Sequence, residues 1–309
     1  MSMRLIRSPA ELKPHGKKVC LAIGFFDGVH LGHQQIIRQT IADAGQHEAI
    51  ALVLTFDRHP NVIVAPARVP PLIYSLPQKL RAIESLGADV LLLLHFDSEL
   101  SEQTGESFVR SLANALGSIR SICVGANFAF GHKRSGNVEL LRKLGAELSF
   151  TVHGLAAVSL DGKAVSSTRI REAVATGNLD AASQMLGRAY SLSGVVISGD
   201  ALGRQLGFPT ANLDPTGLVL PPKGVYAVHA DTGGQTYRAV LNIGLRPTIE
   251  RPNPQLRVEA HLLDFSGDLH GQDLELSFVE KLRDEKKFRS VEELRQQIAE
   301  DIQEAARLF

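Results

Sequence analysis

The apolar pattern of the chain changes near its middle, and this change constrains the fold more than any other feature. In the first part, short apolar runs alternate with amphipathic stretches. The strand candidates are Val19–Phe25, Ile50–Phe56, Asp89–Phe96, Ser121–Val124 and Glu147–Val152. The helix candidates are Gly32–Ala44, Gln78–Leu86, Ser107–Leu116 and Val138–Leu144. Strands that are apolar throughout and alternate with helices predict an α/β domain, in which helices cover both faces of a parallel sheet.

The second part contains short strands without helices between them. The candidates are Tyr190–Ser198, Val225–Ala230, Tyr237–Ile243, Val258–Leu263 and Leu274–Val279. Turn-rich pieces such as Thr232-Gly233-Gly234 and Ser266-Gly267-Asp268 separate them. Many short strands in succession predict a small antiparallel β-barrel or sandwich.

A helix is predicted to close the chain. Ser290 and Glu293 have the spacing of a capping box at its start. We expect its apolar residues to pack against the barrel, because they recur at helical spacing. These residues are Val291, Leu294, Ile298, Ile302 and Ala305. A helical linker is expected from Thr168 to Leu186. Because 309 residues are about twice the usual domain length, we predict two domains, residues 1–186 and 187–309.

Composition argues against several classes of protein. Lys+Arg and Asp+Glu are equal at 33 each, so no net charge attracts nucleic acid or an acidic membrane. The two cysteines, Cys20 and Cys123, lie in apolar runs and fit a reducing cytoplasm better than a disulfide framework. We find no signal-peptide pattern and no apolar run long enough to span a bilayer. We therefore expect a cytoplasmic protein without a nucleic-acid or membrane partner, while the oligomeric state stays open.

A glycine-rich turn, GFFDGVHLGH, joins a predicted buried strand to a predicted helix. Gly24, Gly28 and Gly32 let the backbone approach a ligand and adopt unusual dihedral angles. The free N–H groups at the start of the helix attract an anion. His30 and His33 can donate hydrogen bonds to phosphate oxygens as charge develops there. The turn therefore predicts a nucleoside triphosphate site for nucleotidyl transfer.

The carboxyl ends of parallel strands gather at one edge of a sheet, where ligands bind. Thr55–Pro60 follows a second predicted strand, so it could face the same crevice as the glycine-rich turn. His59 or Asp27 could also join His30 and His33 as zinc ligands. A zinc-dependent hydrolase is therefore an alternative to nucleotidyl transfer.

The segment GRQLGFPTANL, residues 203–213, is the most informative motif of the second part. Thr210 and Asn212 are two residues apart, so both side chains point to one side of an extended segment. Hydroxyl and amide oxygens suit Mg²⁺ bound to ATP phosphates. Gly203 and Gly207 would let the preceding loop fold over those phosphates. A β-turn with a structural asparagine is the alternative.

Several long segments resemble one protein family. GFFDGVHLGH is similar to the HxGH signature of the nucleotidyltransferase superfamily, in the form found in bacterial bifunctional riboflavin kinase/FMN adenylyltransferases (FAD synthetases). TFDRHP, VGANFAFGHKRSG, VSSTRIREAVATGNLDAASQMLGRAYSLSG, GRQLGFPTANL, PKGVYAV, NIGLRPT, VEAHLLDF and KLRDEKKF follow in the order of that family. The resemblance implies a Rossmann-like nucleotidyltransferase domain with a parallel sheet, followed by a riboflavin kinase-like antiparallel barrel with a terminal helix.

The resemblance also implies roles for residues of the first domain. His30 and His33 would stabilise the ATP phosphates, and Gly24, Phe25, Asp27, Gly28 and Gly32 would shape the nucleotide pocket. Ser167, Thr168 and Arg171 would hold the β- and γ-phosphates, although an ordinary helix cap explains the same residues. Asn127 and Phe130, with Phe128, would face the flavin, although core packing explains the two phenylalanines equally well.

In the second domain, the resemblance implies that Thr210 and Asn212 bind Mg²⁺ and that Glu259 is the general base. Glu259 would remove the proton from the ribityl 5′-hydroxyl of riboflavin. Arg283 would lie near the flavin, unless it belongs to a solvated charge cluster. ATP and riboflavin would then give FMN and ADP, and ATP and FMN would give FAD and pyrophosphate. A flavin-binding module that has lost one activity is the alternative from another class.

Overall fold

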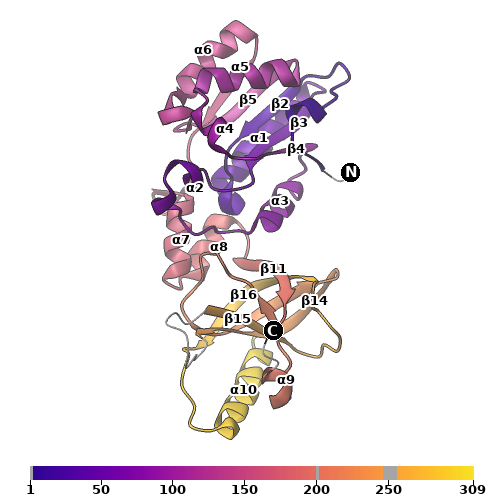
Figure 1. Cartoon of the computed structure of the whole chain (residues 1–309), viewed down its shortest axis with the longest axis vertical. Coiled ribbons are helices and arrows are strands. Elements are labelled where there is room, and N and C mark those ends of the chain that lie inside the picture. Colours follow the sequence, from indigo (N-terminus) through magenta and orange to yellow (C-terminus); the bar gives the residue numbers. More distant parts are fainter. Residues whose placement is uncertain (1–2, 200–201, 246–255) are drawn as a thin grey trace. The chain divides into compact units, whose positions relative to one another are not determined.

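The computed structural model describes residues 3–199, 202–245 and 256–309, and the chain divides into two units (Figure 1). Unit 1 comprises Met1–Pro70 and Leu76–Ser167, and unit 2 comprises Pro71–Ser75 and Thr168–Phe309. Within the described ranges, no helix is both long and apolar enough to cross a membrane. The last three residues of the NIGLRPT segment, 246–248, lie outside the described residues.

Unit 1 is built on the predicted parallel sheet. Its strands are β1 (Arg4–Ile6), β2 (Val19–Ile23), β3 (Ile50–Phe56), β4 (Val90–Leu94), β5 (Ile119–Gly125) and β8 (Thr151–Leu155). Their order across the sheet is β1-β4-β3-β2-β5-β8, and every neighbouring pair is parallel. All five residues of β2 are buried, as expected for a central strand with helices on both faces.

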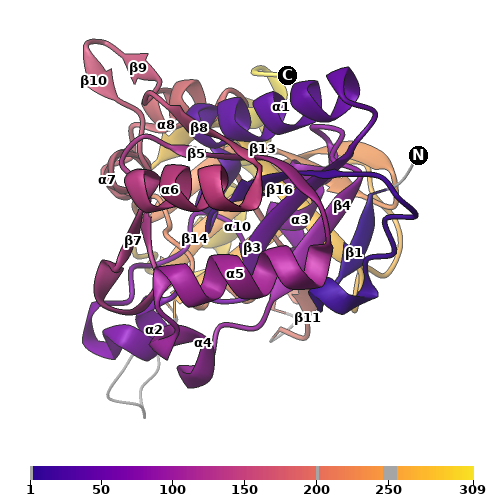
Figure 2. The same ribbon diagram turned by 90° about the horizontal axis from the view of Figure 1, so that it is seen from above.

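Helices cover both faces of this sheet, as predicted. The main helices are α1 (Leu31–Gln46), α3 (Leu76–Glu84), α5 (Gly105–Leu116) and α6 (Val138–Leu148). One apolar core joins Ile37 of α1 and Ile83 of α3 to the sheet, and another joins Leu112 of α5 and Leu141 of α6 to the opposite face. Figure 2 shows α1 and α5 on opposite sides of β3.

Short elements complete unit 1. They are α2 (Asn61–Val64), α4 (Ser98–Glu102), β6 (Ala129–Phe130), β7 (Gly136–Asn137), β9 (Ser159–Leu160) and β10 (Lys163–Ala164). Four short 3₁₀ turns lie at Pro9–Glu11, Asp27–Val29, Pro66–Arg68 and His132–Arg134. The predicted strand Glu147–Val152 was wrong at its start, because α6 continues to Leu148. The helix ends there at Ser149, whose φ is 62°, and β8 begins only at Thr151.

Unit 2 contains a closed antiparallel barrel, which confirms the predicted class. Its strands are β11 (Ser191–Ile197), β12 (Ala211–Leu213), β13 (Gly224–Thr232), β14 (Gln235–Leu245), β15 (Leu256–Leu262) and β16 (Asp273–Arg283). They close in the order β11-β12-β15-β14-β13-β16. Side chains on alternate positions of β13 fill the interior, where Tyr226 and Val228 are buried with Phe278 of β16.

The helices of unit 2 are α7 (Ser167–Ala175), α8 (Leu179–Leu186), α9 (Leu202–Leu206) and α10 (Val291–Ala306). Ser290 caps α10, since its side chain accepts the N–H of Glu293. Ala305 and Ile302 of α10 pack against the outer face of the barrel, as predicted. Val291 does not, because it is 57% exposed. The first turn of α10 thus extends beyond the apolar contact.

The predicted linker forms two helices, α7 and α8, separated by Gly177, whose φ is +82°. Pro71–Ser75 belongs to the same unit as these helices. Leu72 accepts the N–H of Val219 at 2.8 Å, and its own N–H donates to the Gly217 carbonyl at 2.7 Å. The domain boundary after Leu186 stays a prediction. The two compact units instead divide at Thr168, and Pro71–Ser75 also belongs to unit 2.

Candidate active sites

The turn between β2 and α1 shows the unusual backbone conformation that its glycines predict at only one of them. Gly28 has φ +73°, a conformation that side chains with a Cβ rarely adopt. Gly24 is needed for packing within the turn, because a Cβ there would lie 2.7 Å from the ring of Phe26. Neither Gly24 nor Gly32 has a positive φ, so the expected unusual dihedral angle is present only at Gly28.

His30 begins α1 and also caps it. Its Nδ1 accepts the N–H of His33 at 3.4 Å, and the two imidazole rings stack with their centroids 3.6 Å apart. In the neutral form, a ring nitrogen that accepts a hydrogen bond leaves the proton on the other nitrogen. A neutral His30 would therefore carry its proton on Nε2. Asp27, just before it, is only 3% exposed.

His33 is held as a neutral imidazole. Burial, then the neighbouring His30 and then Lys79 hold its pKa well below the usual 6.5. Its Nδ1 is buried and has no hydrogen-bond partner among the described residues. A buried polar atom without a partner costs free energy, which a bound ligand can recover. The two histidines thus form a pair of donors at the start of a helix, where an anion is favoured.

Two adjoining pockets surround this turn. The first, of about 270 Å³, is lined by His30, His33 and Asn127, among others. The second, of about 670 Å³, is lined mainly by apolar residues. The second pocket includes Phe56, Phe96, Phe108, Phe128 and Phe130, with the basic segment His132–Arg134. The pockets share Ile23, Phe25 and Phe128. Two imidazoles and an amide beside an apolar pocket suit a nucleotide joined to a planar ring system.

Phe128 and Phe130 lie both against the core and at a pocket, so a role in flavin binding stays a prediction. Their rings stack with centroids 5.2 Å apart, and both contact the apolar core of the sheet. Both also line the apolar pocket. Core packing therefore fixes both rings in place in the wall of the pocket.

The zinc alternative gains no support from the geometry. Within the described ranges, no three His, Cys, Asp or Glu side chains gather as a metal-binding group. His59 contacts the ring of Phe25 at a centroid distance of 4.9 Å, and its Nδ1 accepts the N–H of Asn61. Thr55 and His59 do lie beside the glycine-rich turn, as expected of two strand ends, since Thr55 Oγ1 donates to the Phe25 carbonyl at 2.9 Å.

The predicted phosphate-binding residues 167–171 fall in both units. Ser167 Oγ donates to the Asp27 carbonyl at 3.3 Å, so this hydroxyl lies next to the glycine-rich turn. Thr168 and Arg171 belong to unit 2. There, Arg171 Nε donates to the Pro71 carbonyl at 2.6 Å.

In unit 2, three polar side chains form a row across neighbouring strands. Asn212 of β12 pairs in register with Glu259 of β15, which pairs with Asn242 of β14. Residues in register on one face of a sheet are close neighbours. The row and Thr210 line a pocket of about 470 Å³, which α10 also lines through Leu294 and Ile298. The strand that carries Glu259 therefore turns it toward a pocket.

The segments beside this row approach it closely, and the loop predicted at Gly203 is instead part of α9. A Cβ on Gly203 would lie 3.2 Å from Thr210 Oγ1 and 2.4 Å from the Phe208 carbonyl oxygen. A Cβ on Gly199 would lie 2.3 Å from Asn212 Nδ2. Gly207 has φ +90°. Hydroxyl, amide and carboxylate oxygens thus lie in a narrow space that side chains on these segments would fill, and such oxygens suit Mg²⁺.

Charged partners fix the other side of the pocket. Arg257 Nη1 donates to Glu259 Oε1 at 3.2 Å. Arg283 makes two hydrogen bonds to Asp301 of α10, from Nε at 2.8 Å and from Nη2 at 2.7 Å. Arg283 lines the pocket, but its guanidinium holds α10 against β16. It is therefore part of the pocket wall rather than of a solvated charge cluster.

Sequence reasoning missed several residues of these sites. Lys79, Phe56, Phe96 and Phe108 reach the first site from elements far apart in the chain, and Asn242 completes the row in the second. Only Lys79 left a signal, because it occupies the apolar stripe of a predicted helix between Leu76, Leu80 and Ile83.

Comparison with family models divides the chain into two successive parts. Residues 12–169 match the FAD synthetase model, and residues 186–309 match the riboflavin kinase model. A bifunctional riboflavin kinase/FMN adenylyltransferase from Haemophilus influenzae is 37% identical over 309 residues, with 99% of each chain covered. One from Bacillus subtilis is 33% identical over 302 residues, with 96% of this chain and 95% of the relative covered.

A solved structure is similar along the same length. The crystal structure of a protein described as a macrolide-efflux protein from Streptococcus pneumoniae matches with a TM-score of 0.83 and 28% identity. It covers 99% of this chain and 99% of its own. The parallel sheet and the barrel therefore both recur in a known fold.

Proposed function

The chain belongs to the bifunctional riboflavin kinase/FMN adenylyltransferase family, and from this premise we propose which residues carry each of its two activities. The N-terminal part is the FMN adenylyltransferase and the C-terminal part is the riboflavin kinase. ATP and flavins are the substrates that the family implies. The observation that carries the residue assignment is the stacked His30–His33 pair at the start of α1, which lines one pocket together with Asn127, beside a second, apolar pocket.

In adenylyl transfer, a phosphate oxygen of FMN attacks the α-phosphorus of ATP, and the bond to pyrophosphate breaks. His30 and His33 donate hydrogen bonds to the phosphate oxygens, whose charge rises in the transition state. The low pKa of His33 suits this role, because a neutral imidazole donates without the cost of burying a cation. The start of α1 supplies further N–H groups.

The substrates are proposed to bind side by side in the two pockets. The nucleotide lies along Gly24, Phe25, Asp27, Gly28 and Gly32, with Asn127 at its edge. The isoalloxazine ring lies in the apolar pocket against Phe130. Ser167, Thr168 and Arg171 are assigned to the β- and γ-phosphates. For Ser167 this is supported by its hydrogen bond to Asp27, and for the other two it rests on the family resemblance.

In the kinase reaction, Glu259 takes the proton of the ribityl 5′-hydroxyl, and that oxygen attacks the γ-phosphorus of ATP. Thr210 and Asn212 are the residues that would hold Mg²⁺, with Gly203 of α9 and Gly207 just after it allowing a close approach. A bound Mg²⁺ would offset the phosphate charge. Arg257 keeps the Glu259 carboxylate oriented, and Arg283 keeps α10 over the flavin pocket.

Two further assignments belong to the proposal. A cytoplasmic location is supported by the free, buried thiols of Cys20 and Cys123. A domain boundary after Leu186 is supported by the riboflavin kinase model, which begins at residue 186.

Two isosteric variants test the assignment. His30→Asn keeps a side chain that can cap α1 but removes the imidazole. It should abolish FAD formation from supplied FMN and leave FMN formation from riboflavin intact. Glu259→Gln should do the reverse. His15→Asn and Glu280→Gln change exposed residues of the same types and serve as controls.

Chromatography of the flavin products, with ATP and Mg²⁺ present, measures both activities in one sample. Wild-type protein given riboflavin should accumulate FMN and then FAD. Unchanged FAD formation in His30→Asn would contradict the role of the histidines, and unchanged FMN formation in Glu259→Gln would contradict that of the base. Replacing Mg²⁺ by a chelator should stop FMN formation, and persistent turnover would contradict the metal assignment.

A further inference from the structure

A buried lysine lies directly behind the glycine-rich turn. Lys79 of α3 is only 4% exposed. Burial lowers its pKa from 10.5 to about 8, although Asp27 and Asp57 oppose this effect. A buried charge is expensive unless it is well bound. The two proposed reactions do not use this ammonium group, so the free-energy cost of burying its charge requires another explanation.

The ammonium joins the ends of two neighbouring strands. Lys79 Nζ donates to the Phe56 carbonyl at 2.8 Å, to the Phe25 carbonyl at 3.2 Å and to Thr55 Oγ1 at 3.4 Å. Thr55 Oγ1 donates to the same Phe25 carbonyl. Nζ also lies 4.3 Å from the centre of the Phe25 ring. Phe25 follows β2 at the start of the turn, and Thr55 and Phe56 end β3.

The turn needs such support, because its backbone is strained. Phe26 has φ +55° and Val29 has φ +40°, a region that residues other than glycine rarely adopt. The carbonyl of Phe25 belongs to the peptide group immediately before Phe26. Two donors on that carbonyl fix the orientation of this peptide group, and so the direction in which the chain continues to His30.

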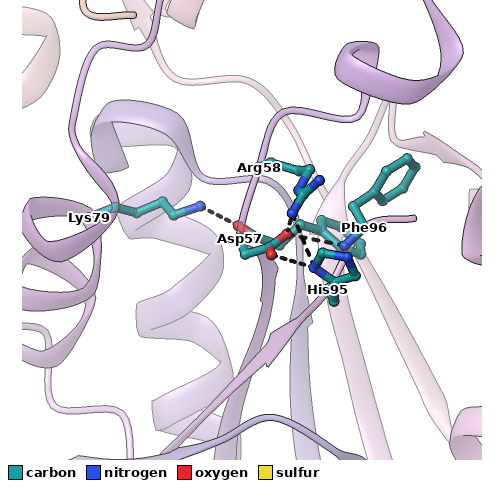
Figure 3. Close-up of polar contacts among 6 residues, drawn as sticks. Asp57, Arg58, Lys79, His95 and Phe96 are labelled. Atoms are coloured by element: carbon teal, nitrogen blue, oxygen red, sulfur yellow. Dashed lines mark hydrogen bonds and ion pairs between the residues drawn. The ribbon is translucent and has the colours of Figure 1, made fainter. Parts of the chain in front are cut away.

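The end of β3 is anchored from its other side as well (Figure 3). Asp57 accepts the N–H of Phe96 at 3.1 Å and contacts Nδ1 of His95 at 2.7 Å, both just after β4. Burial raises the pKa of Asp57, but these hydrogen bonds outweigh it and hold the pKa below the usual 3.8. Lys79 therefore ties the turn to a rigid support.

We propose that Lys79 is a positioning residue for adenylyl transfer, which places His30 and His33 by holding the Phe25 carbonyl against the end of β3. This inference rests on the proposed role of the two histidines. The charged and titratable groups around Lys79 are Asp27 in the turn, His33 on α1 and Asp57 after β3. His59 lies against the Phe25 ring, which Nζ also contacts. Displacement of reacting groups by about 1 Å can cost roughly 100-fold in rate.

The test uses the full chain and three variants. Lys79→Met keeps the length of the side chain and removes the donor, and Lys79→Arg restores a cation. Lys143→Met changes an exposed lysine of the same unit as a control. We expect Lys79→Met to lower kcat/KM for FAD formation from FMN by about 100-fold. We expect Lys79→Arg to recover part of that loss, and FMN formation from riboflavin to stay unchanged in all three.

A pH profile separates positioning from simple packing. Wild-type FAD formation should fall as the pH rises through about 8, where Lys79 loses its proton. In Lys79→Arg, whose charge persists to high pH, this decline should move to higher pH. Circular dichroism identifies any variant that fails to fold. Unchanged kcat/KM in Lys79→Met, or the same alkaline decline in Lys79→Arg, would overturn the inference. A normal rate in His30→Asn would instead contradict the proposed function itself.

Discussion

Removal of the Asp301 carboxylate should destabilise unit 2. Asp301 is 3% exposed and accepts both hydrogen bonds of the Arg283 guanidinium. Its Oδ1 also accepts a hydrogen bond from Gln297 at 2.9 Å. Asp301→Ala would leave the arginine charge without its partner. Breaking a buried pair typically costs 3–5 kcal/mol, and we expect about 3 kcal/mol, because 20% of the Arg283 side chain is exposed.

The chain itself provides a selective probe for this measurement. All four tyrosines lie in unit 2, and the chain has no tryptophan. Tyrosine fluorescence during urea unfolding therefore reports the free energy of unfolding of unit 2. FMN formation should weaken at the same time, because α10 lines the kinase pocket.

A double variant supplies the control. Arg283→Met with Asp301→Leu replaces both charges by apolar groups and should recover most of the lost stability, because no charge remains buried alone. If Asp301→Ala stays within about 1 kcal/mol of wild type, the ion pair does not hold α10 in place, and the reasoning is refuted.

Three other outcomes follow from the structure. Ser290→Ala should lower the stability of unit 2 by about 1 kcal/mol, since it removes the cap of α10, and tyrosine fluorescence during urea unfolding checks this. Burial raises the pKa of Cys123 to about 12, so iodoacetamide should label it at pH 8 only after denaturation, as mass spectrometry would show. The low pKa of Lys79 means that the unfolded chain binds this proton more tightly than the folded chain, so stability rises with pH above about 8. Relative to Lys79→Met, the wild-type protein should therefore gain roughly 2 kcal/mol between pH 7 and 10, as measured by urea unfolding followed by circular dichroism.

The alternation of apolar runs and amphipathic stretches predicted the parallel sheet, because strands buried on both faces are continuous runs of apolar residues. β1 escaped prediction for the opposite reason. It has only three residues at the edge of the sheet, and two of them are exposed. The start of β8 was misplaced because Leu148, Phe150 and Val152 alternate like a strand, although Leu148 still belongs to α6 and is exposed.

In the barrel, the pattern predicted the long strands but not the short one. β12 follows Pro209 and spans only Ala211–Leu213, so its sequence resembles a turn. Val291 was assigned to the packed face of α10 on spacing alone. Helical spacing gives the direction in which a side chain points. Contact also requires a partner surface at that position, and Val291 in the first turn of α10 is exposed.

The two sites differ in how many of their residues could be predicted from the sequence. Gly24–His33 is contiguous, so its residues could be found together. Lys79, Phe56 and Phe96 come from separate elements, and only the sheet order brings them to the turn. In the barrel, Asn242 meets Glu259 through strand register, which no local pattern reveals.

Because Pro71–Ser75 belongs to unit 2, the two units cannot be separated by one cut in the chain. Pro71–Ser75 leaves unit 1, pairs with the segment around Leu218 and returns to unit 1 at Leu76. Ile73 is fully buried there and Tyr74 is 3% exposed. A fragment that ends at residue 186 would carry these two side chains without the segment that covers them, and the complementary fragment would lack them. A single cut therefore does not yield two halves that each keep an intact interior.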